Sequence, residues 1–133
     1  TNDQAGEILY WNPRVGKQVK VTQRNQHWQT WTCTLGFPVM GVWREGYTPS
    51  DLNSLCRSNS QEYVATGDNH SSVRLFNYPC VTEGAPARTY AGHSSFVTCV
   101  RFLCDDRRLV SAGGRDRAIF LFETHAMVRD WEW

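Results

Sequence analysis

The apolar residues of this chain fall into short runs, and no long segment repeats them at helical spacing. Short apolar runs bounded by Gly, Pro, Asn and Asp predict β-strands joined by turns. We expect strands at the following ranges: 7–11, 18–22, 52–57, 62–66, 72–76, 88–90, 96–102, 109–112 and 119–123. One further edge strand is expected in the tail, 125–133. The pattern therefore predicts an all-β chain.

Residues 23–51 interrupt this regularity. The segment is rich in aromatic residues and is broken by Gly and Pro, which favours irregular structure. Its aromatic side chains allow two interpretations: a peptide-binding cleft, or anchors that hold an irregular loop on the edge of a sheet. We favour anchors. The residues concerned are Trp28, Trp31, Phe37 and Trp43.

One motif recurs along the chain. Residues 73–76 resemble residues 119–122, which lie 46 positions later, and residues 8–11 resemble both. A period in the forties with about four strands per unit predicts a β-propeller of the WD-repeat type. A β-sandwich, the other architecture built from many short strands, does not explain one motif at one offset. We therefore expect a propeller fragment of about two and a half four-stranded blades.

The repeat divides the chain into three parts. Residues 1–50 are expected to hold the end of a preceding blade and the irregular segment, residues 51–90 one WD-type blade, and residues 91–133 a second blade and the tail. Because the chain begins with Thr1, we expect a fragment or a processed product. Rings usually close with four to eight blades, so we expect the isolated chain to be marginally stable or to associate.

The last blade carries a polar pair. The Gly92-His93 dipeptide precedes its first strand and Asp116 lies in a later turn, where a short carboxylate bonds local backbone amides. We expect His93 to bond this carboxylate and the two to act as structural fasteners. Together with strands at this spacing, the pair resembles WD-repeat proteins over residues 1–123. The resemblance implies that Trp11, Phe76 and Phe122 share one structural position.

The same resemblance implies departures in the buried polar network. The hydroxyl position of the second strand falls on Ala112 in the last blade and on Thr66 in the blade before. His70 stands at the turn-aspartate position of that earlier blade.

Composition excludes several classes of protein. The net charge of +1 gives no strong attraction to nucleic acid or to an anionic membrane, and no apolar run is long enough to span a bilayer. The five cysteines lack zinc-site spacing, so we expect buried reduced thiols, no metal and no cofactor. The run at 67–70, Gly-Asp-Asn-His, superficially resembles a metallophosphatase motif. Because further metal ligands from other loops are missing, we expect no enzyme activity.

A narrower resemblance covers residues 5–123. The chain is similar to the echinoderm microtubule-associated-protein-like family in the irregular segment and in the turns of both blades. The matching stretches include residues 28–36, 41–43, 51–53, 65–68, 73–76, 92–95 and 113–116. The resemblance implies the C-terminal part of a tandem propeller, in a cytoplasmic, cytoskeletal protein that associates with microtubules.

Two groups of residues are candidates for partner contact. Arg14, Lys17, Lys20 and Arg24 form a basic stretch with no acidic residue between Glu7 and Glu45. The stretch is either a solvated outer strand or a patch for acidic tubulin tails. The turns of the blades carry the second group: His70, Arg115 and Arg117. The expected partners are tubulin, microtubules or other proteins; a generic peptide-binding scaffold is the alternative.

Overall fold

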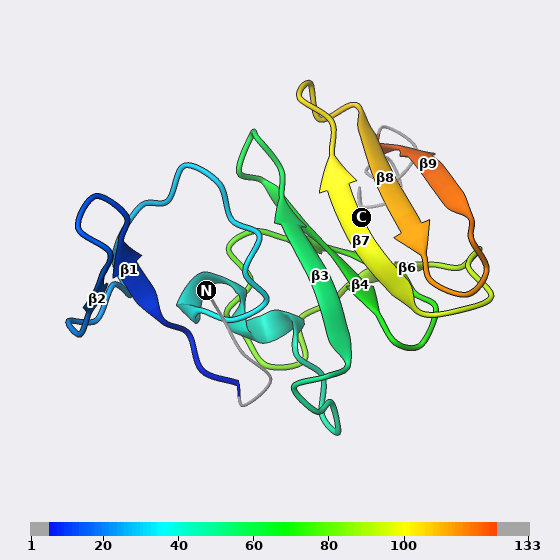
Figure 1. Cartoon of the computed structure of the whole chain (residues 1–133). Helices are drawn as coiled ribbons and strands as arrows, with labels where there is room; N and C mark the ends of the chain where they lie inside the picture. The colour runs from blue at the N-terminus through cyan, green and yellow to red at the C-terminus, as the bar shows by residue number, and fades with distance from the viewer. Residues whose placement is uncertain (1–5, 125–133) are drawn as a thin grey trace.

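The computed structural model describes residues 6–124, which form three antiparallel sheets (Figure 1). The first sheet is a hairpin of β1 (Tyr10–Asn12) and β2 (Lys17–Val19). The second contains, in chain order, β3 (Leu52–Arg57), β4 (Tyr63–Asp68), β5 (Val73–Asn77) and β6 (Arg88–Tyr90). The third contains β7 (Val97–Phe102), β8 (Arg108–Gly113) and β9 (Ile119–Glu123). The all-β fold expected from the sequence is confirmed.

The second and third sheets repeat one unit. Strands β3, β4 and β5 match β7, β8 and β9 in length and pairing order. The pairing of the first two strands is irregular at the same place in both sheets. The register shifts between Leu52 and Ser54 in one sheet and between Val97 and Cys99 in the other. A shared bulge is a specific feature of a backbone, so the two sheets are copies of one blade.

The two copies stack through an apolar seam. Val73 and Leu75 of β5 belong to one buried cluster with Val97 and Val100 of β7. Polar groups also hold the two sheets together where their first strands, β3 and β7, lie side by side (Figure 1). The Ser54 hydroxyl accepts a hydrogen bond from the Val100 N–H at 3.1 Å. Strands covered on both faces read as continuous apolar runs, which explains the Val-Arg-Leu-Phe pattern of β5.

The irregular segment covers the other face of the second sheet. It contains the 3-10 helix η1 (Phe37–Val42), whose Val39 and Val42 pack with Phe76 in a second buried cluster. Gly41 lies against the chain at Cys80, and its N–H donates to the Cys80 carbonyl at 2.8 Å. A side chain at this position would collide with backbone oxygens, so glycine is required. The segment therefore takes the place of a neighbouring blade.

The first hairpin is shorter than the sequence predicts. Strands were expected at 7–11 and 18–22, whereas β1 and β2 have three residues each. Val21, which suggested a longer second strand, is 71% exposed, and Trp11 within β1 is 50% exposed. Exposed apolar side chains add little to the stability of a strand, so the pairing is short. The expected edge strand at 125–133 lies outside the described residues.

The described residues include all five cysteines, and none is in a disulfide. Cys56 and Cys80 are buried and Cys104 is exposed. Burial raises the pKa of the Cys80 thiol to about 11. No helix within residues 6–124 is long and apolar enough to cross a membrane.

Candidate functional site

The predicted basic stretch lies on the first hairpin and the loop that follows it. Arg14 is in the turn between β1 and β2, and its N–H donates to the Asn12 side chain at 3.0 Å. Lys17 begins β2, and Lys20 follows it. All of these cationic side chains are exposed, as is Arg24. The hairpin therefore presents a cluster of solvated positive charge.

Arg24 differs from the other three because its guanidinium is held in place. It lies over the Phe37 ring, 3.8 Å from the ring centroid. A cation over an aromatic face is stabilised by the ring quadrupole and loses mobility. Arg24 is thus fixed at the junction between the hairpin loop and the irregular segment.

The aromatic residues of the irregular segment separate into two pairs. The indole N–H of Trp31 donates to the Cys33 carbonyl, and that of Trp43 to the Thr34 carbonyl, each at 2.9 Å. These two tryptophans anchor the segment, as we expected for the whole group. Trp28 and Phe37 remain 39% and 40% exposed. They border a groove of about 550 Å³ instead.

The second predicted group lies in the turns of the two blades. His70 is in the β4–β5 turn, whereas Arg115 and Arg117 are in the β8–β9 turn, at the same end of the two sheets (Figure 1). His70 is partly engaged, since its Nε2 lies 3.5 Å from an Asp51 carboxylate oxygen. Both arginines are exposed. The basic hairpin lies on the opposite side of the molecule, so the predicted residues form two surfaces rather than one.

The fastener expected in the last blade is present. His93 Nδ1 lies 2.8 Å from a carboxylate oxygen of Asp116, and the Asp116 carboxylate also accepts the Ser94 N–H at 3.2 Å. The other ring nitrogen, Nε2, lies 2.7 Å from the Ser111 hydroxyl. The hydroxyl partner is therefore Ser111, and the expected position at Ala112 is wrong by one residue. The β8–β9 connection is one residue longer than β4–β5, which shifts the alignment.

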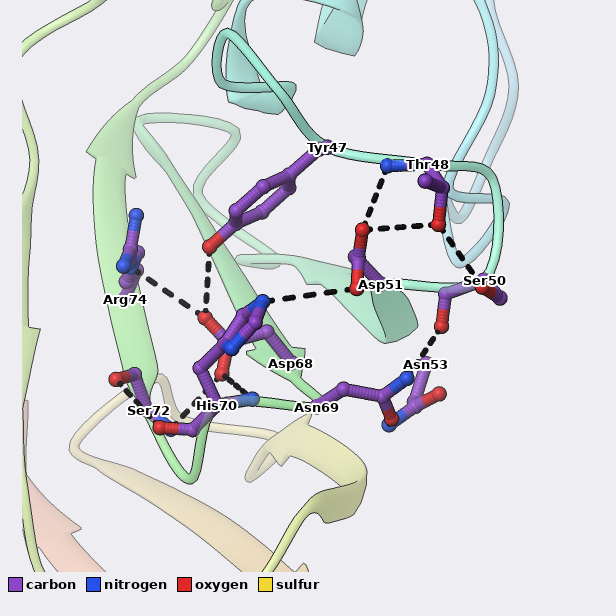
Figure 2. Close-up of polar contacts among 10 residues, drawn as sticks. All are labelled: Tyr47, Thr48, Ser50, Asp51, Asn53, Asp68, Asn69, His70, Ser72 and Arg74. Atoms are coloured by element: carbon purple, nitrogen blue, oxygen red, sulfur yellow. Dashed lines mark hydrogen bonds and ion pairs between the residues drawn. The ribbon is translucent and has the colours of Figure 1, made fainter.

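In the second sheet, a carboxylate likewise bonds the backbone of the turn, but different residues are involved. The fully buried Asp68, at the end of β4, accepts hydrogen bonds from the backbone N–H groups of His70 and Ser72, each at 2.9 Å. Its other oxygen accepts the Tyr47 hydroxyl at 3.0 Å and lies 3.6 Å from Arg74 Nε, as Figure 2 shows. Asp68 therefore supplies the turn carboxylate. His70 stands three residues before β5, as Asp116 stands three residues before β9, but the carboxylate of this blade comes from Asp68.

The two carboxylates come from different positions of the turn. Gly113 stands where Asp68 stands in the earlier blade, since each donates its N–H to the carbonyl just before the following strand. A side chain on Gly113 would occupy the place of the Asp116 carboxylate. Either residue can thus fill one carboxylate site, provided that the other position lacks a competing side chain. The strand registers place Asp68 and Gly113 at equivalent positions, a relation that an alignment on Asp116 does not reveal.

Hydrogen bonds and burial in these networks shift the pKa values of Asp116 and Tyr47. Burial alone raises the pKa of Asp116, but hydrogen bonds from His93 and from the Ala118 and Ser94 N–H groups hold that pKa below its ordinary value. Burial and the nearby Asp68 carboxylate raise the pKa of Tyr47. The Thr66 hydroxyl, the counterpart of Ser111, is buried and has no hydrogen-bond partner among the described residues. The Tyr47 hydroxyl donates to the Asp68 carboxylate and does not bond Thr66, whereas His93 bonds both Asp116 and Ser111.

The remaining predicted structural residues differ in burial. Phe76 is 2% exposed in the core beside η1, and the Phe122 ring lies 5.9 Å from that of Tyr90. Trp11 is half exposed on the first hairpin. Within residues 6–124, no group of three or more His, Cys, Asp or Glu side chains is arranged to hold a metal ion. Asp68 of the Gly-Asp-Asn-His run is instead engaged by Tyr47 and the turn backbone.

Comparison with known proteins gives one consistent family. Residues 1–124 match the family model described as the second beta-propeller of echinoderm microtubule-associated protein. The chain is 50% identical over 115 residues to echinoderm microtubule-associated protein-like 1 of Rattus norvegicus, covering 85% of this chain and 14% of that protein. It is 51% identical over 117 residues to the like-3 protein of Homo sapiens, covering 86% and 13%. It is 43% identical over 121 residues to the human like-2 protein, covering 90% and 19%.

Proposed function

Because this chain belongs to the echinoderm microtubule-associated protein-like family, in whose second propeller its residues fall, we propose that it is a non-catalytic module that binds tubulin or microtubules. Its setting would be the cytoplasm and its cytoskeleton. The chain spans 13 to 19% of the length of the relatives compared above, so this proposal concerns one part of such a protein. Neither a cofactor nor a metal is required.

The basic hairpin carries the proposal. Arg14, Lys17 and Lys20 are exposed together on a short two-stranded element that lies to one side of the stacked blades (Figure 1). No acidic residue occurs between Glu7 and Glu45 to neutralise them. Positive charge clustered on a surface speeds association with an acidic partner and orients it. The acidic tails of tubulin fit this chemistry.

Co-sedimentation of the full-length protein tests the proposal. The double variant Arg14→Ala and Lys17→Ala removes two charges from the hairpin, and Arg107→Ala with Arg108→Ala removes two from the third sheet as a matched control. We expect the hairpin variant to bind intact microtubules about two- to thirtyfold more weakly, and the control to match the unmodified protein. The difference should vanish on microtubules with trimmed tails and shrink at high salt, because exposed charges are screened beyond about 8–10 Å. Equal losses in both variants would refute the role of the hairpin.

A second candidate function is a peptide-binding scaffold whose partner is not tubulin. The exposed Trp28 and Phe37 favour it, because aromatic side chains that remain exposed are frequent in binding sites. If a variant that no longer binds tubulin still binds a peptide, this alternative is supported.

A further inference from the structure

A groove separates the loop after the first hairpin from the edge of the second sheet. It has a volume of about 550 Å³ and is lined from three stretches of chain that are distant in sequence. Its lining includes Arg24, Trp28 and Phe37 of the irregular segment, Arg57 at the end of β3, and Tyr78 and Val81 in the chain after β5. A concave site assembled from separate segments is a common form of binding site.

The walls of the groove are largely apolar. Trp28 is 39% exposed, Phe37 40% and Val81 36%, although each is a large hydrophobic residue. Single exposed apolar residues are ordinary, whereas several that face one hollow mark a contact surface. Tyr10 stacks on Trp28, with the ring centroids 5.9 Å apart, and this contact supports the indole.

The electrostatics of the groove are one-sided. Among the residues that the structure describes, two arginines line it and no aspartate or glutamate does. Arg57 is only 7% exposed, and its guanidinium donates to the carbonyls of Trp28 at 2.6 Å and Gln29 at 3.0 Å and to the Tyr78 hydroxyl at 3.4 Å. All three acceptors are neutral, and no carboxylate pairs with Arg57 among the described residues. A buried charge without a counter-ion leaves a positive potential in its surroundings.

The second cation of the groove, Arg24, is exposed to solvent. The guanidinium of Arg24 lies over the Phe37 ring, so an exposed charge is fixed beside an exposed apolar surface. A neighbouring hollow, which Tyr10 and Arg14 line, shares Trp28 with the groove. The groove and the hollow beside it therefore each contain an arginine.

We propose that this groove binds an extended acidic peptide segment of a partner protein. One aromatic or branched apolar side chain of the peptide packs between Trp28 and Phe37. Carboxylates on either side of it in the peptide lie near Arg24 and Arg57. They supply the negative charge that the groove lacks. This binding site does not require that the partner is tubulin.

Fluorescence anisotropy with the full-length protein tests the inference. The probe is a labelled ten-residue peptide of glutamates around a central phenylalanine. The two matched peptides carry alanine at the centre, or glutamines in place of the glutamates. We expect each matched peptide to bind at least fivefold more weakly than the probe, because one loses the apolar contact and the other the charge. Equal affinity for all three peptides, or no binding of the probe, would overturn the proposal.

Substitutions at two lining positions locate the binding. Phe37→Ala removes apolar surface, and Val81→Asp places a negative charge in the lining of the groove without altering the irregular segment. We expect each to weaken the probe at least fivefold. Leu103→Asp, an equally exposed apolar position in the third sheet, is the control and should leave binding unchanged. If Val81→Asp binds the probe normally, the peptide does not occupy the groove.

Two other outcomes would assign the groove to a different occupant and so refute the proposal. A neutral apolar peptide that binds more tightly than the acidic probe would show that charge plays no part. Self-association that Phe37→Ala abolishes would show that a second copy of the chain fills the groove. Failure of the hairpin variants to affect microtubule binding would contradict the proposed function alone, because the peptide assay does not involve those substitutions.

Discussion

The second and third sheets share one design but differ in what covers them. Val73 and Leu75 of β5 are 0% and 1% exposed, whereas Ile119 and Leu121, their counterparts in β9, are 75% and 56% exposed. The strands have the same length, register and alternation. The second sheet has the third against this face, and the third has no described neighbour there. Apolar residues on both faces of such a strand thus encode the stacking of sheets, beyond the sheet itself.

The turns of the two sheets give a second contrast. His93, Asp116 and Ser111 form a continuous chain of hydrogen bonds in the third sheet. The second sheet uses Tyr47 and Asp68, and its Thr66 hydroxyl has no partner. Both blades therefore contain a carboxylate that bonds the turn, Asp68 in one and Asp116 in the other. Its partners can be exchanged when the length of the turn changes.

Truncation at the counterpart leucines should give the largest difference. Leu75→Ala removes a fully buried side chain and should lower the free energy of unfolding by about 2–5 kcal/mol. Leu121→Ala acts at an exposed position and should change it by less than about 0.5 kcal/mol. Urea denaturation of the 133-residue chain at low protein concentration measures both. An equal loss in the two variants would show that the outer face of β9 is covered in solution.

The two fasteners should differ by a smaller amount. His93→Ala leaves the Asp116 carboxylate and the Ser111 hydroxyl without their partner, which should cost about 1–3 kcal/mol of unfolding free energy. Tyr47→Phe removes one hydroxyl from Asp68, which keeps two backbone N–H donors, so we expect about 0.5–1.5 kcal/mol. The same denaturation experiment compares them. A larger loss for Tyr47→Phe would reverse the order that the hydrogen bonds indicate.

How far the sequence could be read depended on the type of signal. The boundaries of β3 were predicted correctly, because turn residues flank it at 49–51 and at 58–60. Those of β6 and β9 also match the prediction. The hairpin was predicted too long, since apolar composition does not reveal whether a covering sheet exists. Asp68 was missed because it stands at the position of Gly113, so no single offset from Asp116 leads to it.

The candidate surfaces were predicted less completely. The basic hairpin was visible as a run of cations without acids, which is a property of the sequence alone. The groove depends on Arg57 and Tyr78, which are brought to Trp28 by the packing of the irregular segment on the sheet. No local pattern encodes that approach. The difference between anchoring and exposed aromatics likewise appears only once the indole hydrogen bonds are known.

Acid should destabilise the third sheet slightly through Asp116. Hydrogen bonds hold its pKa below the ordinary value, so the unfolded chain takes up a proton first as the pH falls. The stabilisation is complete above the ordinary value of about 4 and is lost below it. Asp116→Asn should flatten this dependence between about pH 5 and 3, as followed by urea midpoints. An unchanged slope would mean that other carboxylates dominate.

The central claim is that these blades are stabilised by their neighbours. Analytical ultracentrifugation of the isolated 133-residue chain, combined with a thermal scan, tests it most directly. With Ile119 and Leu121 exposed, we expect association that increases with protein concentration and a melting temperature that changes with it. A chain that stays monomeric and melts in one sharp, reversible step would contradict the claim.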